Sequence, residues 1–87
     1  MLLYKHLLMK LYNFISLSMD EQAEAASQGV FLCEREAKPY IIFLFNVDNF
    51  YVEVFFDELQ NKITRVKPFK SIRALDPYLE AVTIGKI

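Results

Sequence analysis

The residue types that perform nucleophilic or metal chemistry are scarce in this chain, which has one histidine, His6, and one cysteine, Cys33. Nucleophilic catalysis needs a nucleophile beside a base that a third group orients, and a structural zinc site needs four ligands. His6 falls on the polar side of a segment with helical spacing, whereas Cys33 falls on the apolar side of a strand-like segment. We therefore expect an exposed imidazole and an inert buried thiol, with no catalytic or metal site.

Phosphate-binding loops and paired catalytic carboxylates are also poorly represented. The glycines, Gly29 and Gly85, belong to no phosphate-loop or dinucleotide-binding motif. Neighbouring carboxylates occur at residues 57–58 and at Glu34 and Glu36, positions typical of turns and edge strands, and only burial would make acid catalysts of them. The sequence therefore predicts a protein that is not an enzyme and binds no cofactor.

A basic segment between residues 62 and 73 is the clearest candidate for a binding surface. It contains five cations and no acid. Phe69 within the segment and Tyr51 on the preceding strand add aromatic rings, and basic and aromatic side chains together suit single-stranded nucleic acid. The cations of the segment are Lys62, Arg65, Lys67, Lys70 and Arg73. The candidate partner surface comprises Tyr51, Glu53, Arg65, Lys67, Lys70 and Arg73.

The alternative for this segment is neutralisation by the acids of the preceding strand and turn. Glu53, Asp57 and Glu58 could form cross-strand pairs with its cations. A sequence pI near 5.7 and a net charge of -1 favour this alternative, because nucleic-acid-binding domains are usually strongly basic. Nucleic-acid binding is therefore the second functional hypothesis for the chain.

Helical spacing predicts two helices before the candidate strands. Apolar residues recur at helical intervals between residues 3 and 16, although residues 1–10 could instead form an N-terminal extension. Ser18 and Glu21 have the spacing of a capping box, so a second helix is expected to begin at Met19. Gly29 is expected to end this helix in the left-handed conformation.

Beyond Gly29 the apolar period changes from that of a helix to that of a strand. The segments 30–36, 40–47, 50–57 and 62–69 are rich in β-branched and aromatic residues, and their connections are too short for crossovers. A short helix is predicted over 77–83, with Asp76 as its N-cap and Pro77 in its first turn. The fold class is therefore α+β: a four-stranded antiparallel meander flanked by N-terminal helices and a short C-terminal helix, in one domain of residues 1–87.

The pair Asp48-Asn49 favours a two-residue type I′ turn, which determines the register of the second and third strands. Val47 then pairs with Phe50, and counting outward from this pair makes one face of the hairpin wholly apolar. We expect the helices at both ends of the chain to pack mainly on this face. Its central residues are Phe43, Phe45, Val52 and Val54. The opposite face is mixed, because Glu53 lies among apolar residues there.

The outer two strands are predicted less completely. Closing the first hairpin by pairing Glu36 with Tyr40 places Cys33 on the apolar face and Leu32 on the mixed face. In the last strand Ile63 and Val66 cannot share a face of a regular strand, which predicts either a bulge near Thr64 or an irregular turn around Asn61 and leaves the register open.

Several short motifs of this chain resemble a group of short bacterial proteins of unassigned function. The most recognisable are Phe50-Tyr51-Val52-Glu53-Val54 and Pro77-Tyr78-Leu79, and the others are Leu17-Ser18 with Glu21-Gln22, Gly29, Ile63, Phe69-Lys70-Ser71 and Leu75. The resemblance covers the chain from Leu11 onward. It implies a stand-alone bacterial intracellular protein and carries no activity, and residues 1–10 depart from the pattern of the group.

The apolar content of the chain favours a partner. With 54% hydrophobic residues, five tyrosines and eight phenylalanines, the composition excludes a disordered chain. Short helices can hardly cover both sheet faces, so either the first helix or a second copy of the chain is expected over the mixed face. The leading hypothesis is a non-enzymatic, homodimeric protein-interaction or regulatory module. Its predicted dimer face carries Leu32, Ile42, Leu44 and Phe55.

Cysteine content and hydropathy bear on the location of the protein. A single cysteine allows no disulfide within the chain, which is typical of a reducing compartment. The longest apolar run, residues 40–45, is far shorter than a membrane-spanning helix. We therefore expect a cytoplasmic protein without a membrane partner.

Overall fold

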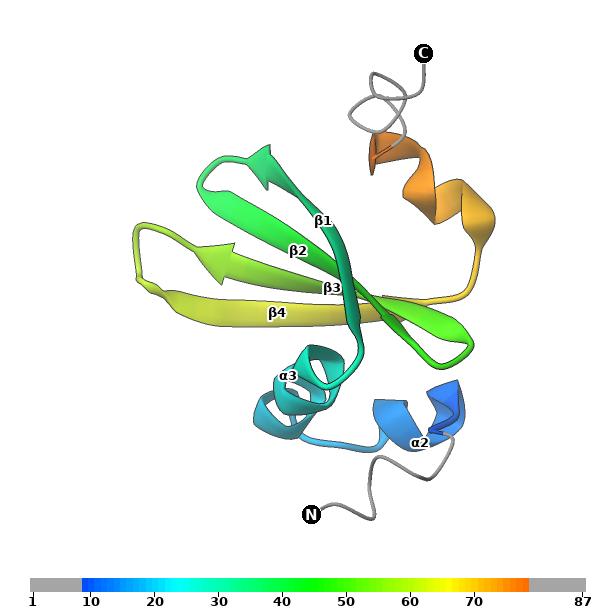
Figure 1. The fold of residues 1–87 in the computed structure, drawn as a ribbon. Helices are drawn as coiled ribbons and strands as arrows, with labels where there is room; N and C mark the ends of the chain where they lie inside the picture. Colours follow the sequence, from blue (N-terminus) through cyan, green and yellow to red (C-terminus); the bar gives the residue numbers. More distant parts are fainter. Residues whose placement is uncertain (1–8, 79–87) are drawn as a thin grey trace.

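The computed structural model describes residues 9–78 and confirms the α+β fold (Figure 1). Two helices, α2 (Leu11–Ile15) and α3 (Met19–Ser27), precede four strands, β1 (Val30–Ala37), β2 (Tyr40–Val47), β3 (Phe50–Asp57) and β4 (Lys62–Phe69). A 3-10 helix, η1 (Ile72–Leu75), follows, and residues 76–78 continue it as α-helix. His6, Gly85 and the helical segments predicted before residue 9 and after residue 78 lie outside the described residues.

The four strands pair antiparallel in sequence order, so β1 and β4 are the two edges of the sheet. The register predicted for β2 and β3 is confirmed from Val47 opposite Phe50 out to Ile41 opposite Phe56. Only Asp48 of the turn has a positive φ, at 51°, so the turn has the predicted length but is not type I′.

The register predicted for β1 is wrong by one residue. Ala37, rather than Glu36, lies opposite Tyr40, because the chain reverses within the two residues Lys38 and Pro39, whose peptide bond is cis. A shift of one residue exchanges the two faces of a strand. Cys33 therefore lies opposite Leu44 on the mixed face and not on the apolar one.

A β-bulge at Leu32 returns the residues before it in β1 to the faces that were predicted for them. Phe31 lies opposite Phe45 and Cys33 lies opposite Leu44, so Leu32 has no partner on β2. Phe31 consequently returns to the apolar face, where its ring meets that of Phe45 edge to face at 5.7 Å.

The bulge predicted in β4 is confirmed. Phe55 lies opposite Arg65 and Phe56 lies opposite Ile63, which leaves Thr64 unpaired. The bulge places Arg65 on the mixed face, together with Lys67, which lies opposite Glu53.

The apolar face is covered by α2 and α3, which lie on one side of the sheet in Figure 1. Phe14 of α2 is fully buried and meets the ring of Phe50 edge to face at 5.3 Å. In α3 the inner residues are Ala25 and Ala26, whereas Met19 is exposed. The small alanine side chains allow the helix to lie close to the sheet.

The start of α3 matches the predicted cap, whereas Gly29 after its end differs from the prediction. The predicted capping box is formed: the Ser18 amide donates to the Glu21 carboxylate at 2.9 Å, and the Glu21 amide donates to the Ser18 hydroxyl at 3.2 Å. Gly29 after the helix does not have the predicted left-handed φ. It is required for a different reason, because a Cβ atom there would collide with the Asn46 carbonyl oxygen of β2.

The prediction that both ends of the chain pack on the apolar face is wrong for the C-terminal segment, residues 72–78. Its residue Tyr78 is buried against Leu44 and Phe69 on the mixed face. Figure 1 shows η1 and residues 76–78 on the opposite side of the sheet from α2 and α3. Asp76 is itself helical and is not an N-cap; Ser71 has that role and accepts a hydrogen bond from the Arg73 amide.

Candidate functional site

The most developed polar arrangement is a buried cluster of Arg35, Glu53 and Tyr78 on the mixed face. Arg35 of β1 reaches across β2, and its Nη2 lies 3.2 Å from Glu53 Oε2 on β3. The Tyr78 hydroxyl donates to the same oxygen at 2.7 Å, and the Arg35 guanidinium lies 5.1 Å from the centroid of the Tyr78 ring. Because Glu53 is only 4% exposed, the cation and the hydroxyl replace the water that its carboxylate loses on folding.

The electrostatics of the cluster indicate a structural role. Burial, together with the hydrogen bond to Glu53, raises the pKa of Tyr78 far above its ordinary value, so the hydroxyl stays protonated and acts as a donor. A tyrosine with a raised pKa is a poor general base and a poor nucleophile at neutral pH. The cluster therefore holds the C-terminal segment against the sheet and offers no acid-base pair.

Metal and thiol chemistry also lack support in the described residues. Cys33 is half-buried beside Leu44, and burial raises the pKa of its thiol, which lowers its reactivity. No three histidine, cysteine, aspartate or glutamate side chains within residues 9–78 are placed to hold a metal ion. None of the helices in that range is long and apolar enough to cross a membrane.

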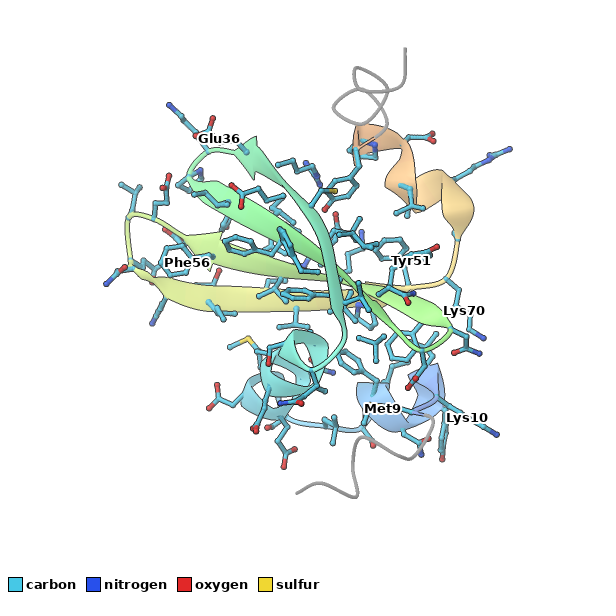
Figure 2. All side chains as sticks on the ribbon, in the orientation of Figure 1. Met9, Lys10, Glu36, Tyr51, Phe56 and Lys70 are labelled. Carbon is cyan, nitrogen blue, oxygen red and sulfur yellow. The ribbon has the colours of Figure 1, made fainter. Side chains whose placement is uncertain are left out.

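The basic residues of the candidate partner surface are all exposed. Arg65 and Lys67 lie on the mixed face of the edge strand β4, and Lys70 and Arg73 follow it. Lys70 is labelled in Figure 2 at the end of the sheet from which the C-terminal segment departs.

The aromatic residues predicted to accompany these cations pack against the C-terminal segment, with Phe69 buried and Tyr51 half-buried. Tyr51 and Phe69 stack at 5.5 Å, with 26° between their rings, but Ala74, Leu75 and Tyr78 cluster around them. Figure 2 shows Tyr51 on the side of the sheet that carries the C-terminal segment. Tyr51 and Phe69 therefore stabilise the fold and are not open for stacking with a base.

Two of the three acids that were expected to neutralise the basic strand, Glu53 and Asp57, are engaged elsewhere. Glu53, opposite Lys67, binds Arg35 and Tyr78. Asp57, opposite Lys62, accepts hydrogen bonds from the Leu59 and Gln60 amides and from the Gln60 side chain. The Gln60 amide is the main reason that the pKa of Asp57 falls below its ordinary value, and the charge of Lys62 contributes less. Among the residues that the structure describes, Arg35 with Glu53 is the only ion pair.

A second group of aromatic residues lies beside the exposed cations instead. The Arg65 guanidinium lies 5.1 Å from the centroid of the Phe55 ring, which Tyr40 meets edge to face at 5.6 Å. Phe55 and Tyr40 are each half-buried. Arg65, Phe55 and Tyr40 thus form a row of one cation and two half-buried rings at the end of the mixed face away from Tyr78.

The four residues of the predicted dimer face are not equivalent in the structure. Ile42 and Leu44 are 1% and 2% exposed, and Leu44 packs against Tyr78 of the same chain. Phe55 is half-buried under Arg65, whereas Leu32 is exposed at the bulge of β1. The centre of the mixed face is thus covered by the C-terminal segment, an arrangement that differs from both predicted alternatives, the first helix and a second copy.

The first half of β1 is the most apolar exposed part of the sheet. Val30, Phe31 and Leu32 are consecutive, and they are 59%, 51% and 45% exposed. The outer side of β1 has no strand partner among the described residues. The other edge, β4, carries exposed cations and Pro68, which are devices that prevent strand pairing.

No protein-family model, no curated protein and no solved structure matches this chain. Sequence reasoning missed Arg35 and Tyr78, since each becomes a partner of Glu53 only through tertiary contacts. The sequence analysis assigned Phe55 to the dimer face and did not connect it with Arg65. Phe55 lies opposite Arg65 because Thr64 is left unpaired at the bulge, so the exact register of β4 was needed to find this contact.

Proposed function

We propose that this protein is a non-enzymatic interaction module that forms a homodimer through the edge of β1. The observation that carries the proposal is the run Val30, Phe31 and Leu32, exposed on an edge strand whose outer backbone groups have no partner in the described structure. An exposed apolar edge strand is a template for pairing with a further strand. The absence of disulfides from a chain with one cysteine supports a cytoplasmic location.

A second copy of this chain is the partner that suits this edge. Two β1 strands related by a two-fold axis would pair antiparallel and extend the sheet from one copy into the other. If the axis passes near Phe31, the apolar residues of the two copies face one another. Glu34 and Glu36 of the two copies then lie at opposite ends of the joint, where their like charges are far apart.

The location at β1 differs from the mixed-face dimer expected from the sequence. Ile42 and Leu44 are already covered within the chain, so pairing through them would require the C-terminal segment to leave. Pairing through β1 leaves the Arg35, Glu53 and Tyr78 cluster intact. It also removes Val30 and Leu32 from water, which the chain alone does not achieve.

Light scattering coupled to size exclusion tests the proposal across a range of protein concentrations. The wild-type protein is expected at twice the 10.2 kDa chain mass at the upper concentrations. Val30→Lys and Leu32→Lys are expected to give the monomer mass at the same concentrations. Leu59→Lys is the control, because Leu59 is an apolar residue in the turn between β3 and β4 that is more exposed than Val30 or Leu32.

Two outcomes would overturn the proposal. One is a concentration-independent monomer mass for the wild type. The other is a dimer that both β1 variants leave unchanged. Thermal unfolding of each variant shows whether the fold itself is retained, since Val30 and Leu32 make few contacts in the chain compared with buried residues.

A further inference from the structure

We infer that the exposed cations of β4, together with the Phe55 ring, form a binding surface for single-stranded nucleic acid. This inference is independent of the proposed homodimer, because it uses the opposite edge of the sheet. The surface consists of Arg65 and Lys67 as cations and of Phe55 and Tyr40 as aromatic residues.

The positive charge of this surface is not cancelled by Glu53 and Asp57 of the neighbouring strand. Glu53 lies opposite Lys67, but its carboxylate is buried and accepts from Arg35 and Tyr78. Asp57 directs both oxygens into the β3–β4 turn. Arg65 and Lys67 are exposed, and neither lies within ion-pair distance of a carboxylate in residues 9–78. The low overall pI thus coexists with a locally basic strand.

The cations lie beside two half-buried aromatic rings, those of Phe55 and Tyr40. Arg65 covers part of Phe55, with its guanidinium 5.1 Å from the ring centroid, and Tyr40 continues the row. Planar guanidinium groups and aromatic rings are the surfaces on which unpaired bases stack. The stacked pair Tyr51 and Phe69 cannot serve, because the C-terminal segment covers it.

The arrangement of the two cations favours a single strand over a duplex or an acidic peptide. Arg65 and Lys67 point to the same face at alternate positions of a strand, so their charges follow the strand direction as a line. A flexible phosphodiester backbone can follow such a line while one base reaches Phe55. A duplex keeps its bases paired and inaccessible to the ring. An acidic peptide would bind the cations but would gain little from the aromatic row.

Fluorescence anisotropy with a labelled oligothymidine of about 12 nucleotides, a length within the usual range of single-strand sites, tests the inference. With two phosphate contacts, the binding constant is expected to fall about 7-fold between about 50 and 200 mM salt. Arg65→Ala is expected to weaken binding by about 10-fold, because it removes a charge and a stacking surface. Lys67→Ala should weaken binding less and should reduce the salt dependence.

Matched variants separate the two contributions. Lys38→Ala removes an exposed lysine from the β1–β2 turn and is expected to leave binding unchanged. Phe55→Leu retains an apolar side chain and is expected to weaken binding several-fold while the salt dependence stays the same.

Three results would overturn the inference. They are no binding at about 50 mM salt, where phosphate contacts are strong, equal competition by a polyglutamate peptide, and equal affinity for a duplex of the same length. The polyglutamate result would reassign the surface to an acidic protein partner. Because Phe55 is half-buried, a urea unfolding curve for Phe55→Leu confirms that the variant is folded under the assay conditions.

Discussion

The hydroxyl of Tyr78 donates a 2.7 Å hydrogen bond to the carboxylate of Glu53, and the two residues are 25 positions apart in the chain. This contact joins the C-terminal segment to the middle of the sheet. It also explains why the mixed face holds a buried acid among apolar side chains. Arg35 from the edge strand β1 completes the arrangement, so three separate parts of the chain meet at one oxygen atom.

Removing the Tyr78 hydroxyl should destabilise the fold. Tyr78→Phe is expected to lower the free energy of unfolding by about 1.5–3 kcal/mol, the usual range for a hydrogen bond to a charged group. Urea unfolding at neutral pH measures the change. Tyr12→Phe removes a hydroxyl from a highly exposed ring and should change the free energy by less than about 0.5 kcal/mol. An equal effect of the two substitutions would contradict the role of the Tyr78 hydroxyl.

The same hydrogen bond predicts a loss of stability in alkali. The pKa of Tyr78 is raised in the folded protein above its ordinary value of 10.0, so the unfolded state loses this proton first as the pH rises. The stabilisation is complete below pH 10 and declines as the pH increases through that value. Parallel urea unfolding of wild type and Tyr78→Phe should therefore show their difference shrinking above pH 10. A difference that grows there would reverse the predicted sign.

Arg35 and Glu53 should be energetically coupled. Arg35→Met leaves the Glu53 carboxylate buried with one partner fewer, and the expected cost is about 2–3 kcal/mol, below the usual range for buried pairs because Arg35 is partly exposed. Adding Glu53→Gln should recover part of this loss. A double-mutant cycle by urea unfolding is expected to give a coupling energy above about 1 kcal/mol. Additive effects would mean that the ion pair does not contribute to stability.

The turn after β3 should contribute an acid-sensitive part of the stability. Hydrogen bonds from Gln60 and Leu59 lower the pKa of Asp57 below 3.8, so the folded state keeps this carboxylate ionised at a lower pH than the unfolded state does. The stabilisation is present above pH 3.8 and is lost as the pH falls through the folded-state value. Asp57→Ala should remove this pH dependence in unfolding curves, whereas Glu58→Gln, at an exposed neighbouring position, should retain it.

Gly29 should not tolerate a side chain. A Cβ atom at this position meets the backbone carbonyl of Asn46, which belongs to the paired strand β2 and has little freedom to move. Gly29→Ala is expected to cost about 2 kcal/mol or more, in the range of overpacked sites. Gln28→Ala, one residue earlier and exposed, is the control and should be nearly neutral. Thermal unfolding of both variants distinguishes close approach from a general intolerance of this segment.

Much of the fold could be predicted because the relevant interactions are local. The bounds of β2, β3 and β4 and the capping box at Ser18 follow from residue alternation and short-range hydrogen bonds. The β2–β3 register follows from a two-residue turn between strands that share an apolar face. A bulge near Thr64 followed from the change of apolar face within β4.

Two of the wrong predictions concern residues whose position depends on other parts of the chain. The face of Cys33 depends on how many residues close the first turn, and both two-residue and three-residue closures are compatible with strand alternation. The cover of the mixed face depends on the direction in which the chain leaves β4, which residue periodicity does not encode.

The sequence alone determined the elements, the central hairpin register and the list of exposed cations, because these depend on period, turn length and charge. Only the tertiary structure decided which acids those cations could reach. In the folded chain Glu53 is buried in contact with Arg35 and Tyr78, so it does not form an ion pair with Lys67. The same arrangement places Tyr78 against Leu44. A buried carboxylate must find partners from anywhere in the chain, and that requirement is satisfied in three dimensions and not along the sequence.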